Sequence, residues 1–328
     1  MRLIAILSVI LSVSVANVYA VNSDSSSPVI GSHSAIVNQA QSLDNSPITT
    51  INSLAGLGVI ASTERGGLFL YNGRKWTSLG KTSDNEQISQ VAFISGQIYV
   101  LSAANNLYVV NYHSKKWQIL QPTKNIKVWD IAANANSLYI AGVNSDNYLL
   151  KSGKLQKLPP LDIKSIYVSS DQEVYAGSST GDLYRYSQGF LAKGWQKVAG
   201  LDGYSKPLWS INKSSVLGVI AGTDDGNIVR YDKDTDSLQP IGNPILSQFD
   251  HSKVWYLQSD ANRVYTVTDN GSLYIYSDGY WKKHEITVGS ESDVKVWSIY
   301  LSGNILYVGT ENGMVIAYNL KSSNMDIL

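Results

Sequence analysis

The stretch VWYLQSDANRVYTVTDNGSLYIYSDGYW, residues 254–281, holds four runs of β-branched and aromatic residues. Three of the runs cover residues 254–257, 264–267 and 273–276, and the fourth begins at Trp281. Asn, Asp, Gly and Ser fill the gaps, which is typical of short strands joined by tight turns. The stretch therefore predicts a four-stranded antiparallel sheet.

The same pattern recurs along the chain and is marked by the motif Gly-x-Leu/Ile/Val-x-x-Tyr. The motif occurs at Gly66 to Tyr71, Gly181 to Tyr186, Gly226 to Tyr231, Gly271 to Tyr276 and Gly313 to Tyr318. Two further units carry Asn105 and Asp146 at the glycine position. A tight hairpin needs a residue with positive φ there, and Gly, Asn and Asp tolerate it. The mean spacing of about 41 residues is in the range of propeller blades.

Seven such units predict the fold class. Four short strands cannot bury a core alone, but sheets stacked radially cover one another's faces and close into a ring. We therefore expect an all-β, seven-bladed β-propeller with four antiparallel strands per blade over residues 47–328. Two closures of the ring are open: residues 325–328 complete the last blade, or residues 35–38 join it as a clasp.

The units resemble the broad superfamily of propeller repeats that includes the WD40, kelch and regulator-type propellers. The resemblance covers residues 47–328 and implies the architecture alone. The Gly-His and Trp-Asp dipeptides of WD40 units do not recur as a pair, and the Gly66-Gly67 pair lies in a hairpin turn, unlike the kelch double glycine. No family function follows from it.

The N-terminus indicates export. Arg2 precedes an apolar run over residues 3–15 that is short for a membrane span, and Val18 and Ala20 provide the small residues of a cleavage site. We expect a signal peptide over residues 1–20, with an uncleaved anchor as the alternative, and a flexible Ser-rich leader over residues 21–46. The expected location of this bacterial-type protein is periplasmic or secreted.

The composition narrows the partner classes. Lys plus Arg and Asp plus Glu are 26 each, so no polybasic surface for nucleic acid is expected. The chain has no cysteine, and its four histidines form no metal-spaced pair. No stretch after the signal peptide is apolar enough to span a membrane. The sequence thus predicts a monomer without metal, cofactor, nucleic-acid partner or membrane span.

Tryptophans recur at the start of the innermost strands. Those strands are expected to begin at residues 48, 88, 128, 163, 208, 254 and 296, and four of them have tryptophan second: Trp129, Trp209, Trp255 and Trp297. Lysine stands two residues before three of the four, at Lys127, Lys253 and Lys295. One interpretation is a ligand-binding ring of indole and ammonium groups at a channel mouth. The other is that the indoles are packing wedges between blades.

The third position of the same strands has one carboxylate, Asp130. Glycoside hydrolysis usually needs two facing carboxyl groups, so we predict no catalytic residue and expect Lys164 of the next blade to pair with Asp130. Acidic residues at the hairpin tips, such as Glu64, Asp269 and Glu311, are expected to share a face with the inner-strand starts.

These features favour a binding module over an enzyme. The module would recognise a protein or glycan partner through one face and the channel mouth, using the four tryptophans, the lysines, Asp130 and Lys164. The alternative is a carbohydrate-active hydrolase or lyase with its site in the central channel.

Overall fold

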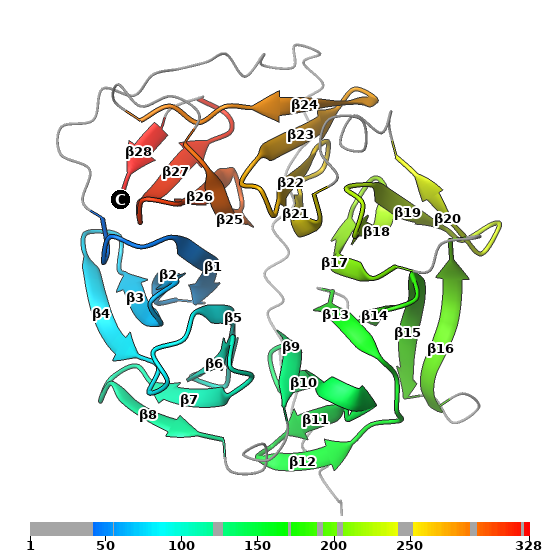
Figure 1. Ribbon diagram of the computed structural model, residues 1–328, viewed down its shortest axis with the longest axis horizontal. Coiled ribbons are helices and arrows are strands. Elements are labelled where there is room, and N and C mark those ends of the chain that lie inside the picture. The colour runs from blue at the N-terminus through cyan, green and yellow to red at the C-terminus, as the bar shows by residue number, and fades with distance from the viewer. Residues whose placement is uncertain are drawn as a thin grey trace, which may run out of the picture. The chain divides into compact units, whose positions relative to one another are not determined.

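The computed structural model describes residues 42–54, 56–120, 127–169, 172–188, 193–201, 206–241, 252–288, 294–322 and 325–328. All of them belong to one compact unit, residues 32–328. Seven four-stranded antiparallel sheets form a ring around a central channel, and the chain passes through them in order (Figure 1). The predicted seven-bladed β-propeller is confirmed.

Each blade takes four consecutive strands, the first of which is innermost. Blade 1 consists of β1 (Ile48–Leu54), β2 (Gly58–Thr63), β3 (Gly67–Tyr71) and β4 (Trp76–Lys81). Blade 2 consists of β5 (Ile88–Ile94), β6 (Gln97–Ser102), β7 (Leu107–Asn111) and β8 (Lys116–Ile119). Blade 3 consists of β9 (Val128–Ala133), β10 (Ser137–Gly142), β11 (Tyr148–Lys151) and β12 (Lys154–Lys157). A single 3₁₀ turn, η2 (Val143–Ser145), joins β10 to β11.

The remaining blades repeat this plan. Blades 4 and 5 consist of β13 (Ile163–Val168), β14 (Val174–Ser178), β15 (Asp182–Gln188) and β16 (Lys193–Gly200), and of β17 (Leu208–Ser214), β18 (Gly218–Thr223), β19 (Ile228–Asp232) and β20 (Ser237–Pro240). Blades 6 and 7 consist of β21 (Val254–Ser259), β22 (Val264–Thr268), β23 (Leu273–Ser277) and β24 (Tyr280–His284), and of β25 (Val296–Ser302), β26 (Ile305–Thr310), β27 (Val315–Asn319) and β28 (Met325–Ile327).

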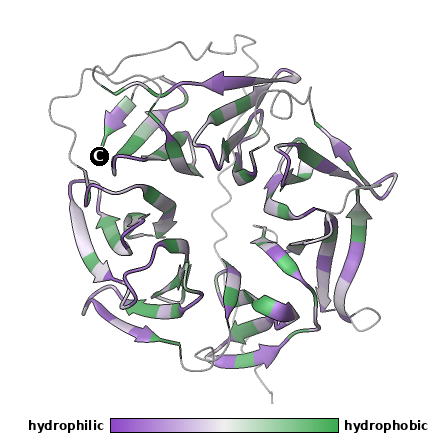
Figure 2. Cartoon of the chain, viewed as in Figure 1, coloured by the Kyte–Doolittle hydropathy of each residue, from purple (hydrophilic) through white to green (hydrophobic). Residues whose placement is uncertain are grey.

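The hydrophobic core lies between blades. One cluster joins Ile60 and Leu68 of blade 1 to Ile88 and Ile98 of blade 2, and similar clusters join blades 2 to 3, 3 to 4, 4 to 5, 5 to 6 and 7 to 1. Figure 2 shows the outermost strands as mostly hydrophilic and the inner strands as richer in hydrophobic residues. Burial of one such side chain contributes roughly 1.5–3 kcal/mol, so each blade is stabilised chiefly by its neighbours.

The hairpin turns that join the second and third strands of each blade confirm most of the predicted motif. Gly66, Asn105, Gly181, Gly226, Gly271 and Gly313 all have positive φ. The prediction for Asp146 is wrong, because its φ is −86° and the positive values fall on Asn144 and Ser145. The loop between β10 and β11 covers residues 143–147 and is longer than the corresponding loops of the other blades, which have three or four residues. The hairpin of blade 3 therefore has its positive φ values before Asp146.

Within the described residues, each blade of the ring is built from one continuous segment. Strand β28 pairs with β27, so residues 325–327 complete blade 7 within its own repeat. At the seam with blade 1, Ser298 Oγ donates to the Ile48 carbonyl at 2.7 Å. A Cβ at Gly309 would lie 2.6 Å from Cγ2 of Ile48, so only glycine allows this approach. The alternative clasp at residues 35–38 lies outside the described residues, as does the predicted signal peptide.

The last residues of the predicted leader contact the propeller. The Asp44 carboxylate accepts hydrogen bonds from Thr63 Oγ1 and Ser46 Oγ, both at 2.6 Å. Leu43 N donates to the Gly313 carbonyl at 3.1 Å. Residues 43–46 therefore span the seam between blades 1 and 7 and form part of the domain.

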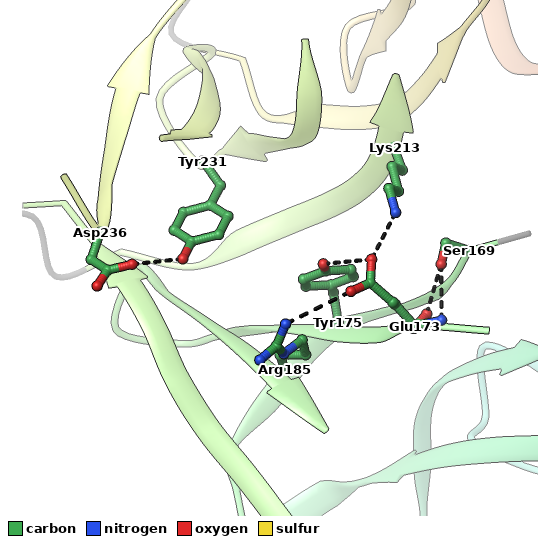
Figure 3. A network of polar contacts seen from close by, with 7 residues as sticks. All are labelled: Ser169, Glu173, Tyr175, Arg185, Lys213, Tyr231 and Asp236. Carbon is green, nitrogen blue, oxygen red and sulfur yellow. Dashed lines mark hydrogen bonds and ion pairs between the residues drawn. The ribbon is translucent and has the colours of Figure 1, made fainter. Parts of the chain in front are cut away.

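A polar network joins blades 4 and 5 on the side of the β13–β14 turn (Figure 3). The Glu173 carboxylate accepts hydrogen bonds from Lys213 Nζ at 2.7 Å and from the Tyr175 hydroxyl at 3.0 Å. It also forms an ion pair with Arg185 at 3.7 Å. Burial and this carboxylate raise the pKa of Tyr175 to about 12. Lys213 belongs to blade 5 and the other three residues to blade 4, so the network links the two sheets.

Candidate functional site

A β-bulge recurs at the second residue of every inner strand. In blade 6, for example, Val254 pairs with Thr268 and Tyr256 with Val267, which leaves Trp255 as an extra residue. The same shift occurs in the other blades. The seven bulged residues are Thr49, Ser89, Trp129, Lys164, Trp209, Trp255 and Trp297. A bulge redirects its side chain, so each blade presents one of these residues at the same level of the ring.

The bulged residues lie near the face that carries the hairpin tips, which we call the tip face. Backbone hydrogen bonds hold the turn after each second strand to the start of the inner strand: Val143 N donates to the Lys127 carbonyl, Asp269 N to that of Lys253 and Glu311 N to that of Lys295, at 2.8, 3.1 and 3.0 Å. The expectation that tips and inner-strand starts share a face is confirmed. Lys127 and Lys295 are exposed on this face.

Three of the four predicted tryptophans form a continuous row at the channel mouth. The ring centroids of Trp129 and Trp209 lie 6.0 Å apart, and those of Trp209 and Trp255 lie 6.4 Å apart with planes inclined by 17°. The Trp209 indole N–H donates to Asp224 at 2.7 Å, and that of Trp129 donates to the Lys164 carbonyl at 3.1 Å. Trp297 occupies the bulge of blade 7 and is half-buried. The row thus covers blades 3, 5 and 6.

The four predicted tryptophans differ in burial: Trp209 and Trp297 are half-buried. Trp129 and Trp255 are 38% and 44% exposed. The other four tryptophans lie on outermost strands and belong to or pack against the hydrophobic clusters between blades: Trp76, Trp117, Trp195 and Trp281. Each packs against a tyrosine of its own blade in a tilted or edge-on arrangement, with ring centroids 5.0–5.7 Å apart. Trp117 and Trp281 also donate to carbonyls of the preceding blade at 2.9 and 3.0 Å.

Two lysines at the mouth, Lys164 and Lys253, have acidic partners. Lys164 Nζ lies 4.8 Å from the centroid of the Trp129 ring and 3.1 Å from Asp162 Oδ1. Lys253 Nζ lies 4.7 Å from the centroid of the Trp209 ring and 3.9 Å from Asp224. Cation–π contacts of this kind are worth about 0.5–1 kcal/mol at exposed sites. They hold the indoles in place while the carboxylates compensate the positive charge.

Below the mouth the channel encloses a cavity of about 410 Å³ lined by all seven blades. Trp209 and Trp255 contribute to its wall, so mouth and cavity are continuous. Third-position side chains hydrogen-bond between blades: Ser165 Oγ donates to the Leu208 carbonyl at 2.8 Å and Ser210 Oγ to that of Val254 at 3.1 Å. These bonds form a rigid wall around the cavity.

Asp130 takes the same position in blade 3 but bonds differently. Its carboxylate accepts the backbone N–H groups of Ile131 and of Ile166 in blade 4, both at 2.8 Å. Burial raises the pKa of its carboxyl to about 7, although the two N–H donors favour the ionised form. The predicted ion pair with Lys164 is wrong. Lys164 lies in the bulge, which directs it to the mouth and to Asp162.

The described part of the chain places one carboxylic acid, Asp130, among the residues that line the cavity. It contains no cluster of three His, Asp or Glu side chains that could hold a metal ion. Two features of the wall were not predicted as parts of the site. Gln90 and Gln258 are among the residues that line the cavity, and the Tyr256 hydroxyl donates to the Thr49 carbonyl of blade 1 at 2.6 Å.

The fold and this site define a seven-bladed propeller with an aromatic channel mouth. The sequence matches no known family profile and no curated protein. Among solved structures, the extracellular domain of BT4673 from B. thetaiotaomicron aligns with 86% of this chain at 20% identity and a TM-score of 0.66. The chain covers 40% of that domain. YCF48 from Cyanidioschyzon merolae aligns with 86% of the chain and 98% of its own length, at 14% identity and a TM-score of 0.64.

These likenesses establish the propeller fold. Within the described residues, helices of the length and apolar character needed to cross a bilayer are absent.

Proposed function

We propose that this protein is a binding module that takes a protein or glycan partner on the tip face and channel mouth. The observation that carries the proposal is the row of Trp129, Trp209 and Trp255, in which Trp129 and Trp255 are 38% and 44% exposed. Large exposed aromatic groups on a rigid frame are typical of binding sites.

The proposed setting is the periplasm or the cell exterior, with the propeller acting as a monomer. The expected signal peptide supports export. The likeness to a domain described as extracellular in another protein agrees with it. The lack of cysteine suits either compartment because no thiol is exposed to oxidation.

The test compares Trp129→Ala/Trp255→Ala with Tyr280→Ala, which removes an exposed aromatic ring on the outermost strand of blade 6. Wild type and Tyr280→Ala should retain the same ligand from a glycan array or a cell-envelope extract, and the double variant should lose it. Thermal unfolding should show all three folded, since Trp129 and Trp255 are partly exposed. If the double variant unfolds, the indoles are packing wedges and the proposal fails.

A carbohydrate hydrolase or lyase is the second candidate, and the pKa of about 7 for Asp130 in the channel wall favours it. A general acid works best with a pKa near the operating pH. The candidate requires turnover of a glycan panel by the wild type and its loss in Asp130→Asn. Turnover that persists in this variant would exclude Asp130 as the acid.

A further inference from the structure

The chemistry of the cavity restricts the ligand further. The described residues that line it include no Lys, Arg or His. The one acid, Asp130, directs its carboxylate oxygens to the N–H groups of Ile131 and Ile166. A ligand in this cavity therefore meets uncharged side chains and one carboxyl group whose oxygens already accept backbone hydrogen bonds. An anionic ligand would lose hydration there without gaining a counter-charge.

The charges at the channel mouth also favour an uncharged ligand. Lys164 and Lys253 are the cations in contact with the indole row, and each is paired with an aspartate, Asp162 and Asp224. An anionic ligand would have to compete with these carboxylates. The indoles thus offer flat apolar faces, and the two lysines that contact them are each balanced by a carboxylate, which suits an uncharged ring.

Two side chains of the wall are available to a polar ligand. The carboxamides of Gln90 and Gln258 line the cavity, whereas those of Asn52 and Asn212 donate to the carbonyls of Val91 and Leu257. No described residue hydrogen-bonds to the side chain of Gln90 or Gln258. They belong to blades 2 and 6, three blades apart around the ring. Each carboxamide both donates and accepts, as a sugar hydroxyl does.

We propose that the channel takes the end of a neutral oligosaccharide, with sugar rings against the indoles of Trp209 and Trp255 and hydroxyl groups on the carboxamides of Gln90 and Gln258. This inference rests on the proposed binding function and names its ligand class. The cavity volume of about 410 Å³ lies in the range of small-ligand pockets, about 300–1,000 Å³. The channel therefore suits a chain end, and the mouth continues the contact outward.

The experiment measures binding of cellohexaose, chitohexaose, maltohexaose, xylohexaose and mannohexaose, with hexagalacturonate as the anionic comparison. Titration calorimetry gives the affinity, and intrinsic tryptophan fluorescence reports contact with the row. We expect at least one neutral hexasaccharide to bind and change the emission, and hexagalacturonate to bind more weakly. Gln90→Leu and Gln258→Leu should each weaken binding about tenfold, the usual effect of one lost hydrogen bond.

The matched control is Gln118→Leu, which changes an exposed glutamine on the outermost strand β8 and should bind like wild type. Equal unfolding midpoints for the three Gln→Leu variants show that they fold. Tighter binding of hexagalacturonate, absence of binding to every neutral hexasaccharide, or unchanged affinity in both wall variants would each overturn the inference. Should a protein partner still require Trp129 and Trp255 in that case, the proposed function stands and only the glycan assignment fails.

Discussion

Replacement of Asp130 by serine tests how the channel wall is held together. Asp130 sits where blades 4, 5 and 7 have Ser165, Ser210 and Ser298, each of which donates to a carbonyl of the next blade. Serine therefore restores the residue type of the neighbouring seams and removes the buried titratable group.

The magnitude follows from the two pKa values of the group. Burial raises the pKa of Asp130 from 3.8 to about 7, and one pKa unit corresponds to about 1.4 kcal/mol, so the penalty on the ionised folded form is about 4 kcal/mol. Because the folded-state pKa lies above the unfolded value, this penalty is absent below about pH 4 and complete above about pH 7. Wild type should therefore lose stability across that window through this group.

The assay is urea unfolding of both proteins from pH 4 to pH 8. Serine leaves the N–H groups of Ile131 and Ile166 without the carboxylate, so Asp130→Ser should be the less stable protein at pH 4. The free energy of unfolding of the variant relative to wild type should then rise by about 4 kcal/mol toward pH 8. Ser165→Ala is the control, because it removes a wall hydrogen bond without a titratable group and should cost about 1 kcal/mol at every pH.

Stability curves that run parallel for wild type and Asp130→Ser between pH 4 and pH 8 would refute this reasoning. They would mean that the carboxyl titrates at its ordinary pKa, despite its burial.

Three further changes test other contacts. Gly309→Val should destabilise the seam between blades 7 and 1 by about 1–3 kcal/mol in urea unfolding, because the new Cβ meets Ile48 at 2.6 Å; an unchanged midpoint would show that the seam is loosely packed. Glu173→Gln should lower the pKa of Tyr175 from about 12 toward its usual 10 without reaching it, since burial remains; ultraviolet titration measures this, and no change would mean that burial alone raises the pKa. Trp281→Phe leaves the Ile241 carbonyl without its indole donor and should cost about 1–3 kcal/mol in unfolding free energy; a smaller loss would indicate that water replaces the bond.

The fold was predictable because the residue types that recur in each repeat have known backbone preferences. Glycine or asparagine with positive φ marks six of the seven hairpins at the expected residue. The prediction failed for the seventh hairpin, at Asp146, because the loop between β10 and β11 is longer than the others and its positive φ values fall on Asn144 and Ser145. The residue type at one position does not report the length of the loop around it.

The site was only partly predictable. The spacing of the repeats located the four tryptophans, but it left open whether they bind a ligand or pack between blades. The direction of each indole depends on a β-bulge, and the residue types around the bulge do not reveal it. The pairing of Asp130 with Lys164 was wrong for the same reason: the bulge places Lys164 at the mouth. The sequence did not mark Gln90 and Gln258 as binding residues, because which carboxamides remain unbonded depends on the assembled ring.

Side-chain and loop contacts close the ring, and this determines how the order of the blades along the chain can be permuted. Each blade is one continuous segment, and the seam between blades 7 and 1 relies on Ser298, Gly309 and residues 43–46 where other seams have a peptide link. A circular permutant that begins at β5 and ends at β4 would keep every sheet intact. Whole blades are thus the natural units of recombination for this propeller. Replacing one blade would also replace the single bulged residue that this blade contributes to the mouth.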